Sequence, residues 1–140
     1  MDPLSITTGC VTLVATITKL TVQINGFVRE VRGARSDLDA VSRELHSLTT
    51  VLEMLAHDVG NTARSALPPS LAQQVTGIVK NCGGVVSQIK ASLEKHSGES
   101  ARLKKGVQWS WGGKSDMEQL RSSLEAHKSA LDIALQVVEM

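Results

Sequence analysis

The longest regular pattern of apolar positions lies at the N-terminus, between Pro3 and Val31. Apolar residues recur there at alternating steps of four and three, which is the spacing of a helix that packs along one face. These positions are Ile6, Cys10, Leu13, Ile17, Leu20, Ile24, Phe27 and Val31. Asp2 is a good N-cap, and Pro3 suits the first turn of a helix. The pattern therefore predicts one long N-terminal helix.

This first helix is unusual in its charge and in its residue types. Lys19 is the one charged residue between Pro3 and Val28. Nine of the fourteen residues from Val11 to Ile24 are β-branched, which lowers the intrinsic tendency to form a helix. Packing must then hold the segment helical, and this suits a helix that can leave its bundle. The alternative is an ordinary core helix that stays buried.

Three further segments show the same heptad spacing, and each follows a helix start signal. We expect helices from the N-cap Ser36 to about His57, from about Pro69 to Lys95, and from Ser115, which opens a capping box, towards the C-terminus. Their apolar seams are Leu38, Val41, Leu45, Leu48, Leu52 and Leu55; Leu71, Val75, Ile78, Cys82, Val85, Ile89 and Leu93; and Met117, Leu120, Leu124, His127, Leu131, Ala134 and Val138.

These seams predict an all-α fold, an up-down bundle of four to five helices that includes the long apolar N-terminal helix. Connections are expected at residues 60–70 and 97–114, the second with a short helix near residues 100–105. Gly83 and Gly84 lie inside the third helix, either because another helix approaches closely or because the helix bends there. The residues expected in the core include Leu45, Leu48, Leu52, Ile78 and Leu124.

Composition limits the protein to one domain, residues 1–140, with a formal net charge of +1. That charge argues against a general nucleic-acid binder, so no nucleic-acid partner is expected. Cys10 and Cys82 fall on apolar seams, which predicts buried, reduced thiols and a reducing compartment. No secretory signal is evident, and no run reaches the ~20 apolar residues of a spanning helix. We therefore expect a soluble, cytoplasmic resting state.

The residues of common catalytic and cofactor sites are missing from the sequence. It contains no GxxxxGK[ST], GxGxxG, HExxH or CxxC motif. None of the four histidines has a second His or Cys three or four residues further on. No nucleophile–base pair stands out either. We therefore expect no enzyme activity, no cofactor and no metal site.

Basic residues gather in one stretch of the chain. The formal charge is +6 over residues 64–114 and −3 over residues 115–140. The densest part comprises Arg102, Lys104 and Lys105, followed by Trp109 and Trp111. Basic side chains beside tryptophan suit contact with an anionic membrane surface. The alternative is a solvated loop whose tryptophans cover one end of the bundle.

Several segments together resemble one protein family. They are Met1–Ile6, Phe27–Arg32, the Leu-x-x-Leu-x-x-Val-Leu run from Leu45 to Leu52, Trp109–Lys114 and Met117–Leu135. Their sequence and order resemble fungal HeLo-like domains, the N-terminal domains of fungal NOD-like (STAND) receptors and related cell-death proteins. The resemblance covers essentially the whole chain. Glycine-zipper spacing is not evident, since Gly9 and Gly26 are the glycines of the first helix.

The resemblance implies a helical bundle that forms the N-terminal part of a longer protein, with a nucleotide-binding or amyloid-signalling region on its C-terminal side. It also implies regulated necrosis: the domain oligomerises on activation, moves to the plasma membrane and permeabilises it through its N-terminal helix. That helix maps here to Pro3, Leu4, Ile6, Cys10, Leu13, Val14, Ile17 and Leu20. The alternative function is a soluble adaptor that docks other helices without acting on membranes. Charges at Val14 and Thr18, which lie off the main seam, are expected to block insertion and to spare the fold more than a charge at Leu13.

Overall fold

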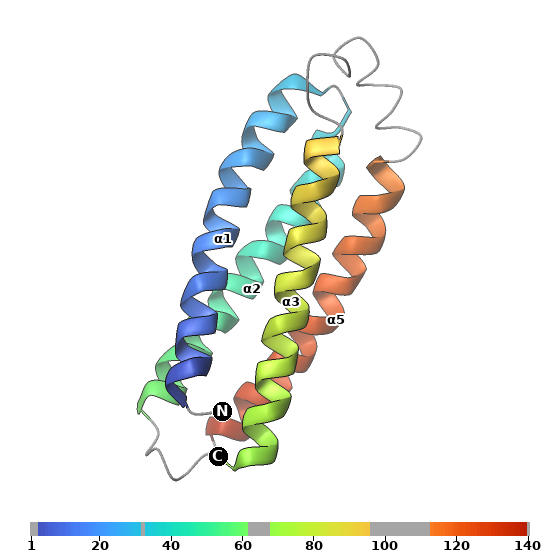
Figure 1. The fold of residues 1–140 in the computed structure, drawn as a ribbon. Coiled ribbons are helices and arrows are strands. Elements are labelled where there is room, and N and C mark those ends of the chain that lie inside the picture. The colour runs from blue at the N-terminus through green and yellow to red at the C-terminus, as the bar shows by residue number, and fades with distance from the viewer. Residues whose placement is uncertain (1–2, 32, 62–67, 96–112, 140) are drawn as a thin grey trace.

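Four long helices make up the fold in the computed structural model, which describes residues 3–31, 33–61, 68–95 and 113–139 (Figure 1). They are α1 (Pro3–Glu30), α2 (Arg35–Asn61), α3 (Pro69–Lys95) and α5 (Lys114–Glu139). Within these residues there is no strand. The all-α prediction is therefore confirmed, including the long apolar helix at the N-terminus. The short helix expected near residues 100–105 falls outside the described residues.

The turn between α1 and α2 depends on Gly33, whose φ of 89° is in the left-handed region that glycine adopts without strain. The backbone N–H of Val31 still donates to the carbonyl of Phe27, at 2.9 Å. The carbonyl of Ala34 accepts from the N–H of Leu38, at 3.0 Å, so helical bonding starts before Ser36. The N-cap is therefore Ala34, two residues before the predicted Ser36.

The helices alternate in direction, but successive helices are not always neighbours. Around the bundle the order is α1, α2, α5 and α3, and each helix packs on the two beside it (Figure 1). α2 and α3 follow each other in sequence but occupy opposite corners, as do α1 and α5. The neighbouring pairs α1–α3 and α2–α5 are consequently parallel. A simple up-down bundle would have only antiparallel neighbours.

Leucine, valine and isoleucine fill a single core that runs the length of the bundle. Leu45, Leu48, Leu52 and Leu124 are all fully buried, as predicted. Ile78 is only half-buried, so that part of the core prediction is wrong. Because α3 packs on both α1 and α5, it buries more than one residue in some of its turns. The buried residues of α3 are Ala72, Val75, Cys82, Val85, Val86, Ile89, Ser92 and Leu93.

Gly83 and Gly84 lie within α3, which continues through them as one helix. A Cβ atom added to Gly83 would meet only Leu13 Cδ1, at 4.0 Å, and one added to Gly84 would meet nothing within 4 Å. These are ordinary or open surroundings. Of the two explanations given for the pair, close approach of another helix is therefore wrong.

Candidate functional site

The inward face of α1 is built as its heptad pattern predicts. Ile6, Cys10, Leu13, Ile17 and Leu20 are all buried against α2 and α3. The predicted helix also included Pro3 and Leu4, which lie in the first turn of α1. Their side chains are outside the described part of the structure.

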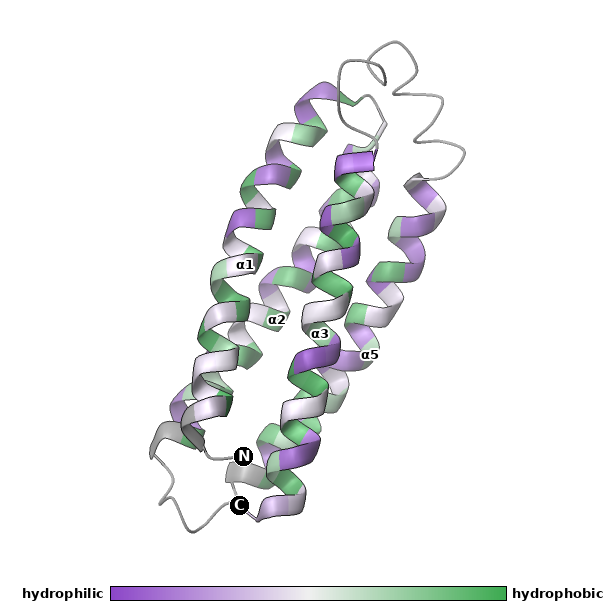
Figure 2. Cartoon of the chain, viewed as in Figure 1, coloured by the Kyte–Doolittle hydropathy of each residue, from purple (hydrophilic) through white to green (hydrophobic). Residues whose placement is uncertain are grey.

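The outward face of α1 carries a second row of heptad-spaced residues, at steps of three and four. We call this row the α1 outer stripe; it comprises Thr8, Val11, Ala15, Thr18 and Val22. All five are exposed, Val11 by 60% and Val22 by 69%. None carries a charge. Figure 2 shows the same contrast, because hydrophilic residues recur along α2, α3 and α5 but are scarce in the N-terminal half of α1.

Val14 does not belong to this exposed row. It is half-buried and packs against the core from the side of α1, whereas Thr18 is exposed. A charge at the buried Leu13 would still be more damaging than one at the half-buried Val14. A glutamate there would place a carboxylate in partly apolar surroundings, which costs stability. Charges at Val11 and Val22 probe the same helix with less damage.

Three threonines of α1 bond their hydroxyl groups to the backbone of their own helix. The hydroxyl of Thr16 donates to the carbonyl of Thr12 at 3.1 Å, and that of Thr18 donates to the carbonyl of Val14 at 3.0 Å. Thr21 makes the equivalent bond to Ile17, also at 3.0 Å. A hydroxyl bonded within its own helix loses less on leaving water than a free one does. These residues therefore interrupt the apolar character of α1 less than the sequence suggests.

α1 is also long and apolar enough to cross a membrane. Residues 5–30 form a helix of 26 residues with a mean hydropathy of 1.3 in its best window, and only 28% of that window is buried. The expectation that no run reaches spanning length is wrong for this helix by that criterion. Core helices of soluble proteins pass the same test of length and composition. What sets α1 apart is its lack of charge, because Lys19 is its one charged residue between Pro3 and Val28, whereas α2, α3 and α5 each expose several.

A groove lies between the N-terminal half of α1 and the middle of α3. Its volume is about 510 Å³, within the usual size of ligand pockets. Small residues and short polar ones make up most of the lining: Ser5, Ile6, Gly9, Thr12, Leu13, Thr16, Thr76, Val79, Lys80, Gly83 and Ser87. Lys80 is the one charged residue among them. The groove leaves α1 less completely packed on its α3 side.

The two cysteines lie in the core, Cys10 on α1 and Cys82 on the adjacent α3. Both are free and fully buried, as predicted. Burial raises the pKa of each thiol to about 11, and for Cys82 the proximity of Cys10 adds to the effect. Both groups are therefore protonated thiols at neutral pH, and buried thiols of this kind are poor nucleophiles.

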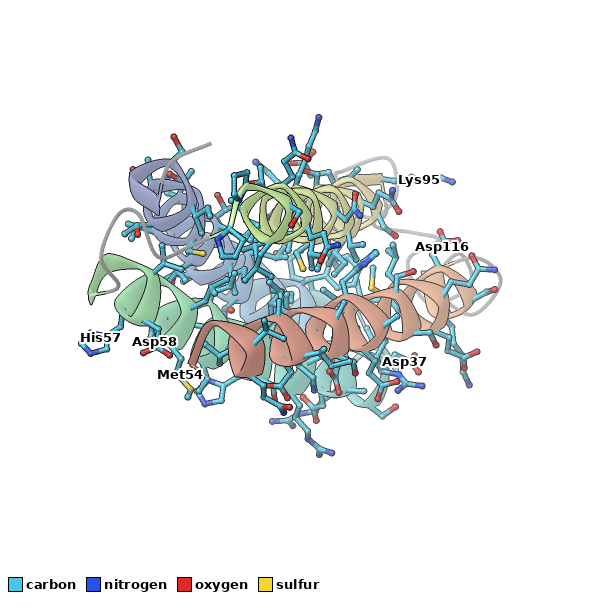
Figure 3. The ribbon with its side chains drawn as sticks, turned by 90° about the horizontal axis from the view of Figure 1, so that it is seen from below. Asp37, Met54, His57, Asp58, Lys95 and Asp116 are labelled. Carbon is cyan, nitrogen blue, oxygen red and sulfur yellow. The ribbon has the colours of Figure 1, made fainter. Side chains whose placement is uncertain are left out.

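Charge is divided between the two pairs of parallel helices. α1 and α3 together carry five basic and two acidic residues, a formal charge of +3, whereas α2 and α5 carry five basic and ten acidic residues, a formal charge of −5. In Figure 3, Lys95 lies at the end of α3, while Asp37 and Asp58 lie on the α2 side. The bundle thus has a basic layer, α1 with α3, and an acidic layer, α2 with α5.

One ion pair joins the helices of the acidic layer. Lys128 Nζ on α5 lies 3.0 Å from Glu44 Oε2 on α2, and both side chains are largely buried. This pair is not evident from the sequence. Its two residues are 84 positions apart, and the sequence alone does not show that α2 neighbours α5.

The other predicted site residues receive no structural test. Arg102, Lys104, Lys105, Trp109 and Trp111, the expected lipid-contacting loop, lie outside the described residues. His127, on the seam of α5, is half-buried. Within the described ranges, no group of three or more His, Cys, Asp or Glu side chains could hold a metal ion.

One family model matches the chain over its whole length. It is described as the N-terminal region of the pigment biosynthesis cluster protein PigL, and the match covers residues 1–140. Among curated proteins none matches the chain, and none of the solved structures does so either. The match agrees with an N-terminal helical domain, and its description assigns the domain no activity.

Proposed function

The chain belongs to the PigL N-terminal family, and we propose that this member is a HeLo-like cell-death effector domain. In this proposal the domain rests in the cytoplasm and oligomerises on activation. It then binds anionic lipid at the plasma membrane and permeabilises the membrane through α1. A nucleotide-binding or amyloid-signalling region on its C-terminal side would supply the activating signal. The domain needs no catalytic residue for this role.

The observation that carries the proposal is the α1 outer stripe. Helices of water-soluble bundles carry charged residues on their exposed side, and α2, α3 and α5 each expose several along their length. α1 exposes the uncharged outer stripe and has one charged residue, Lys19, between Pro3 and Val28, on a helix that also has the length to span a bilayer. Its exposed threonines at positions 16 and 18 bond to their own backbone. Such a surface is compatible with hydrocarbon.

Release of α1 from the bundle has a free-energy cost that the membrane must offset. The inward seam, from Ile6 to Phe27, would lose its packing, at ~25 cal/mol per Å² of apolar surface returned to water. Lipid or neighbouring copies of the domain would cover that surface instead. The groove beside α3 favours this step, because α1 has less packing to lose on that side.

A liposome leakage assay on the full chain tests the proposal. We expect dye release from vesicles that contain anionic lipid, and less from neutral vesicles. The variant Val11→Glu with Val22→Glu should stay folded, since both side chains are exposed, but should release little dye because each carboxylate must enter hydrocarbon. Circular dichroism and the denaturation midpoint establish that the variant is folded.

The matched control places the same two charges on another helix. Ser36→Glu with Met54→Glu adds two carboxylates at exposed positions of α2, in the acidic layer and away from the α1 outer stripe. This control should leak vesicles almost as well as the wild type. If the folded Val11→Glu, Val22→Glu variant leaks as fast as the control, α1 is not the membrane-active element.

A soluble helical adaptor is the second candidate, and the groove between α1 and α3 favours it. A groove lined by glycine, serine and threonine permits close approach of another helix. An adaptor would bind partner helices while causing no leakage from vesicles of any composition. Leakage by the wild-type chain therefore separates the two candidates.

A further inference from the structure

α5 also carries an exposed, uncharged row of residues, at steps of four and three. We call it the α5 outer stripe; it comprises Ser122, Ala126, Ser129, Ile133 and Val137. Ile133 is 63% exposed and Val137 is 46% exposed. The inward seam of α5 is a separate row that includes Leu124 and Leu131, both fully buried. The core therefore does not explain the outer stripe.

The two outer stripes lie on opposite sides of the molecule. α1 and α5 occupy opposite corners of the bundle, and each stripe faces away from the core. They include four of the five large hydrophobic side chains that the described residues expose, the fifth being Met54 on α2. One copy of the chain cannot bring the two stripes together, but two copies can.

The stripes match each other in length and in side-chain size. Each spans about 21–23 Å along its helix, from Thr8 to Val22 on α1 and from Ser122 to Val137 on α5. Each combines small residues with aliphatic ones. Steps of three and four with small residues in the row are the pattern by which helices pack side by side at 8–10 Å.

Charge next to the stripes is complementary. On α1, Lys19 adjoins Thr18, and no carboxylate occurs between Pro3 and Arg29. On α5, Arg121, Glu125, Lys128 and Asp132 adjoin the stripe. Arg121 lies 3.6 Å from Glu125, and Lys128 pairs with Glu44 at 3.0 Å, so Asp132, next to Ile133, is the charge left to face a partner. The layers behind the stripes carry formal charges of +3 and −5. Complementary potentials of this kind orient two surfaces and favour their encounter.

We propose that the α1 outer stripe of one copy packs along the α5 outer stripe of a second copy. The contact is heterologous, because each copy offers a different surface to each neighbour. It therefore repeats from copy to copy and builds a ring or an open filament. This contact forms between folded bundles in water and does not depend on the proposed membrane activity. It also covers the α1 outer stripe wherever no membrane is present.

Cross-linking between two single-cysteine variants tests the contact. Ala15 and Ser129 are the central residues of their stripes, so Ala15→Cys and Ser129→Cys meet whether the helices pack parallel or antiparallel. A short bismaleimide is added to a vesicle-free mixture of the two variants. The native thiols of Cys10 and Cys82 are buried and protonated, and they should not react. We expect a covalent dimer in the mixture and little in either variant alone.

Three further samples make the result specific. The variant that carries both new cysteines should give a ladder of dimers, trimers and larger species, as a repeating contact requires. Gln73→Cys, exposed on α3, replaces Ser129→Cys as the matched control and should give only background. Ile133→Glu, added to the Ser129→Cys variant, should abolish the dimer because it places a carboxylate within the contact, one turn from its centre.

The proposal is overturned if the mixture gives no more dimer than the Gln73→Cys control. It is also overturned if Ala15→Cys links to itself as efficiently as to Ser129→Cys, since the contact would then be symmetric. If no dimer forms without vesicles, and anionic vesicles protect the Ala15→Cys thiol from the maleimide, lipid is the sole partner of the α1 outer stripe and the proposal is overturned. Leakage by the folded Ile133→Glu variant reports separately on the proposed membrane function.

Discussion

Packing between aliphatic side chains holds the bundle together. Phe27 supplies the single aromatic ring of the described core, and the rest of the packing comes from leucine, isoleucine, valine and smaller residues. Cores of this kind are sensitive to the loss of methyl groups at their most enclosed positions, because neighbouring side chains relax only partly into the cavity.

Truncation of core residues should therefore follow burial rather than residue type. Leu48→Ala should lower the free energy of unfolding by ~2–5 kcal/mol, because Leu48 is fully buried. Ile78→Ala should cost clearly less, because Ile78 is only half-buried. Urea denaturation measures both, with Met54→Ala, at an exposed residue of α2, as the control. Equal losses in the two core variants would contradict the packing described for α3.

The sequence identified most core residues because a heptad row marks the face that a helix buries. The row from Ile6 to Val31 is buried at every position. In α3 the same rule named Ile78 and missed Val86. A helix that packs between two neighbours buries a wide stripe of residues. A heptad row names one residue at each step, so it does not show which residues across that stripe are the most buried.

At the scale of the helices, α1 packs on α2 and on α3, and the groove lies between α1 and α3. The sequence predicted each helix to within a few residues at its ends, because caps and glycines mark where helices begin and stop. It did not predict which helices are neighbours. Heptad rows show that a helix packs but carry no record of its partner, so the placement of α1 beside α3 required the structure.

A disulfide between α1 and α3 should show whether α1 must leave the bundle to act. A Cβ atom added to Gly9 would lie 3.8 Å from Val79 Cγ1, so Gly9 and Val79 face each other between α1 and α3, and we choose Gly9→Cys with Val79→Cys as the disulfide pair. The oxidised variant should keep the helical spectrum and resist denaturation, and it should release much less dye from anionic vesicles. Reduction should restore the release.

The reduced form of the same protein is the control for both substitutions. Peptide mapping of the oxidised sample by mass spectrometry establishes that the two introduced thiols, at positions 9 and 79, pair with each other rather than with a native thiol. Equal leakage before and after reduction would mean that α1 acts on lipid while still docked against α3. That result would leave the membrane function in place and remove the release step.

At the scale of the whole molecule, the division of charge follows from the order of the helices. The sequence placed an excess of basic residues at positions 64–114, part of which lies on α3. It could not show that α3 lies beside the nearly uncharged α1 and opposite the acidic α2. The sequence thus identified α1 as the candidate site. It did not show that the basic helix α3 lies beside α1, because that depends on packing between distant segments.

This arrangement predicts how the bundle approaches a membrane. The layer formed by α1 and α3 should face anionic lipid, because each lysine near such a surface contributes ~1 kcal/mol. Lys80→Glu with Lys90→Glu should therefore weaken binding to anionic vesicles by ~2 kcal/mol or more, roughly 30-fold. Binding of the wild type should also weaken as salt rises, since the screening length falls from about 8 Å at 0.15 M to about 3 Å at 1 M.

A control variant makes the same change in net charge on the acidic layer. It shows whether binding depends on which layer faces the membrane or only on the net charge. Arg43→Glu with Arg121→Glu reverses two basic residues of α2 and α5, one on each helix. If the basic layer faces the membrane, this variant should bind nearly as well as the wild type, because its new carboxylates point away from the lipid. Vesicle co-sedimentation at several salt concentrations measures both variants. Equal weakening of the two would show that net charge alone governs binding, and the bundle would then have no preferred face towards the membrane.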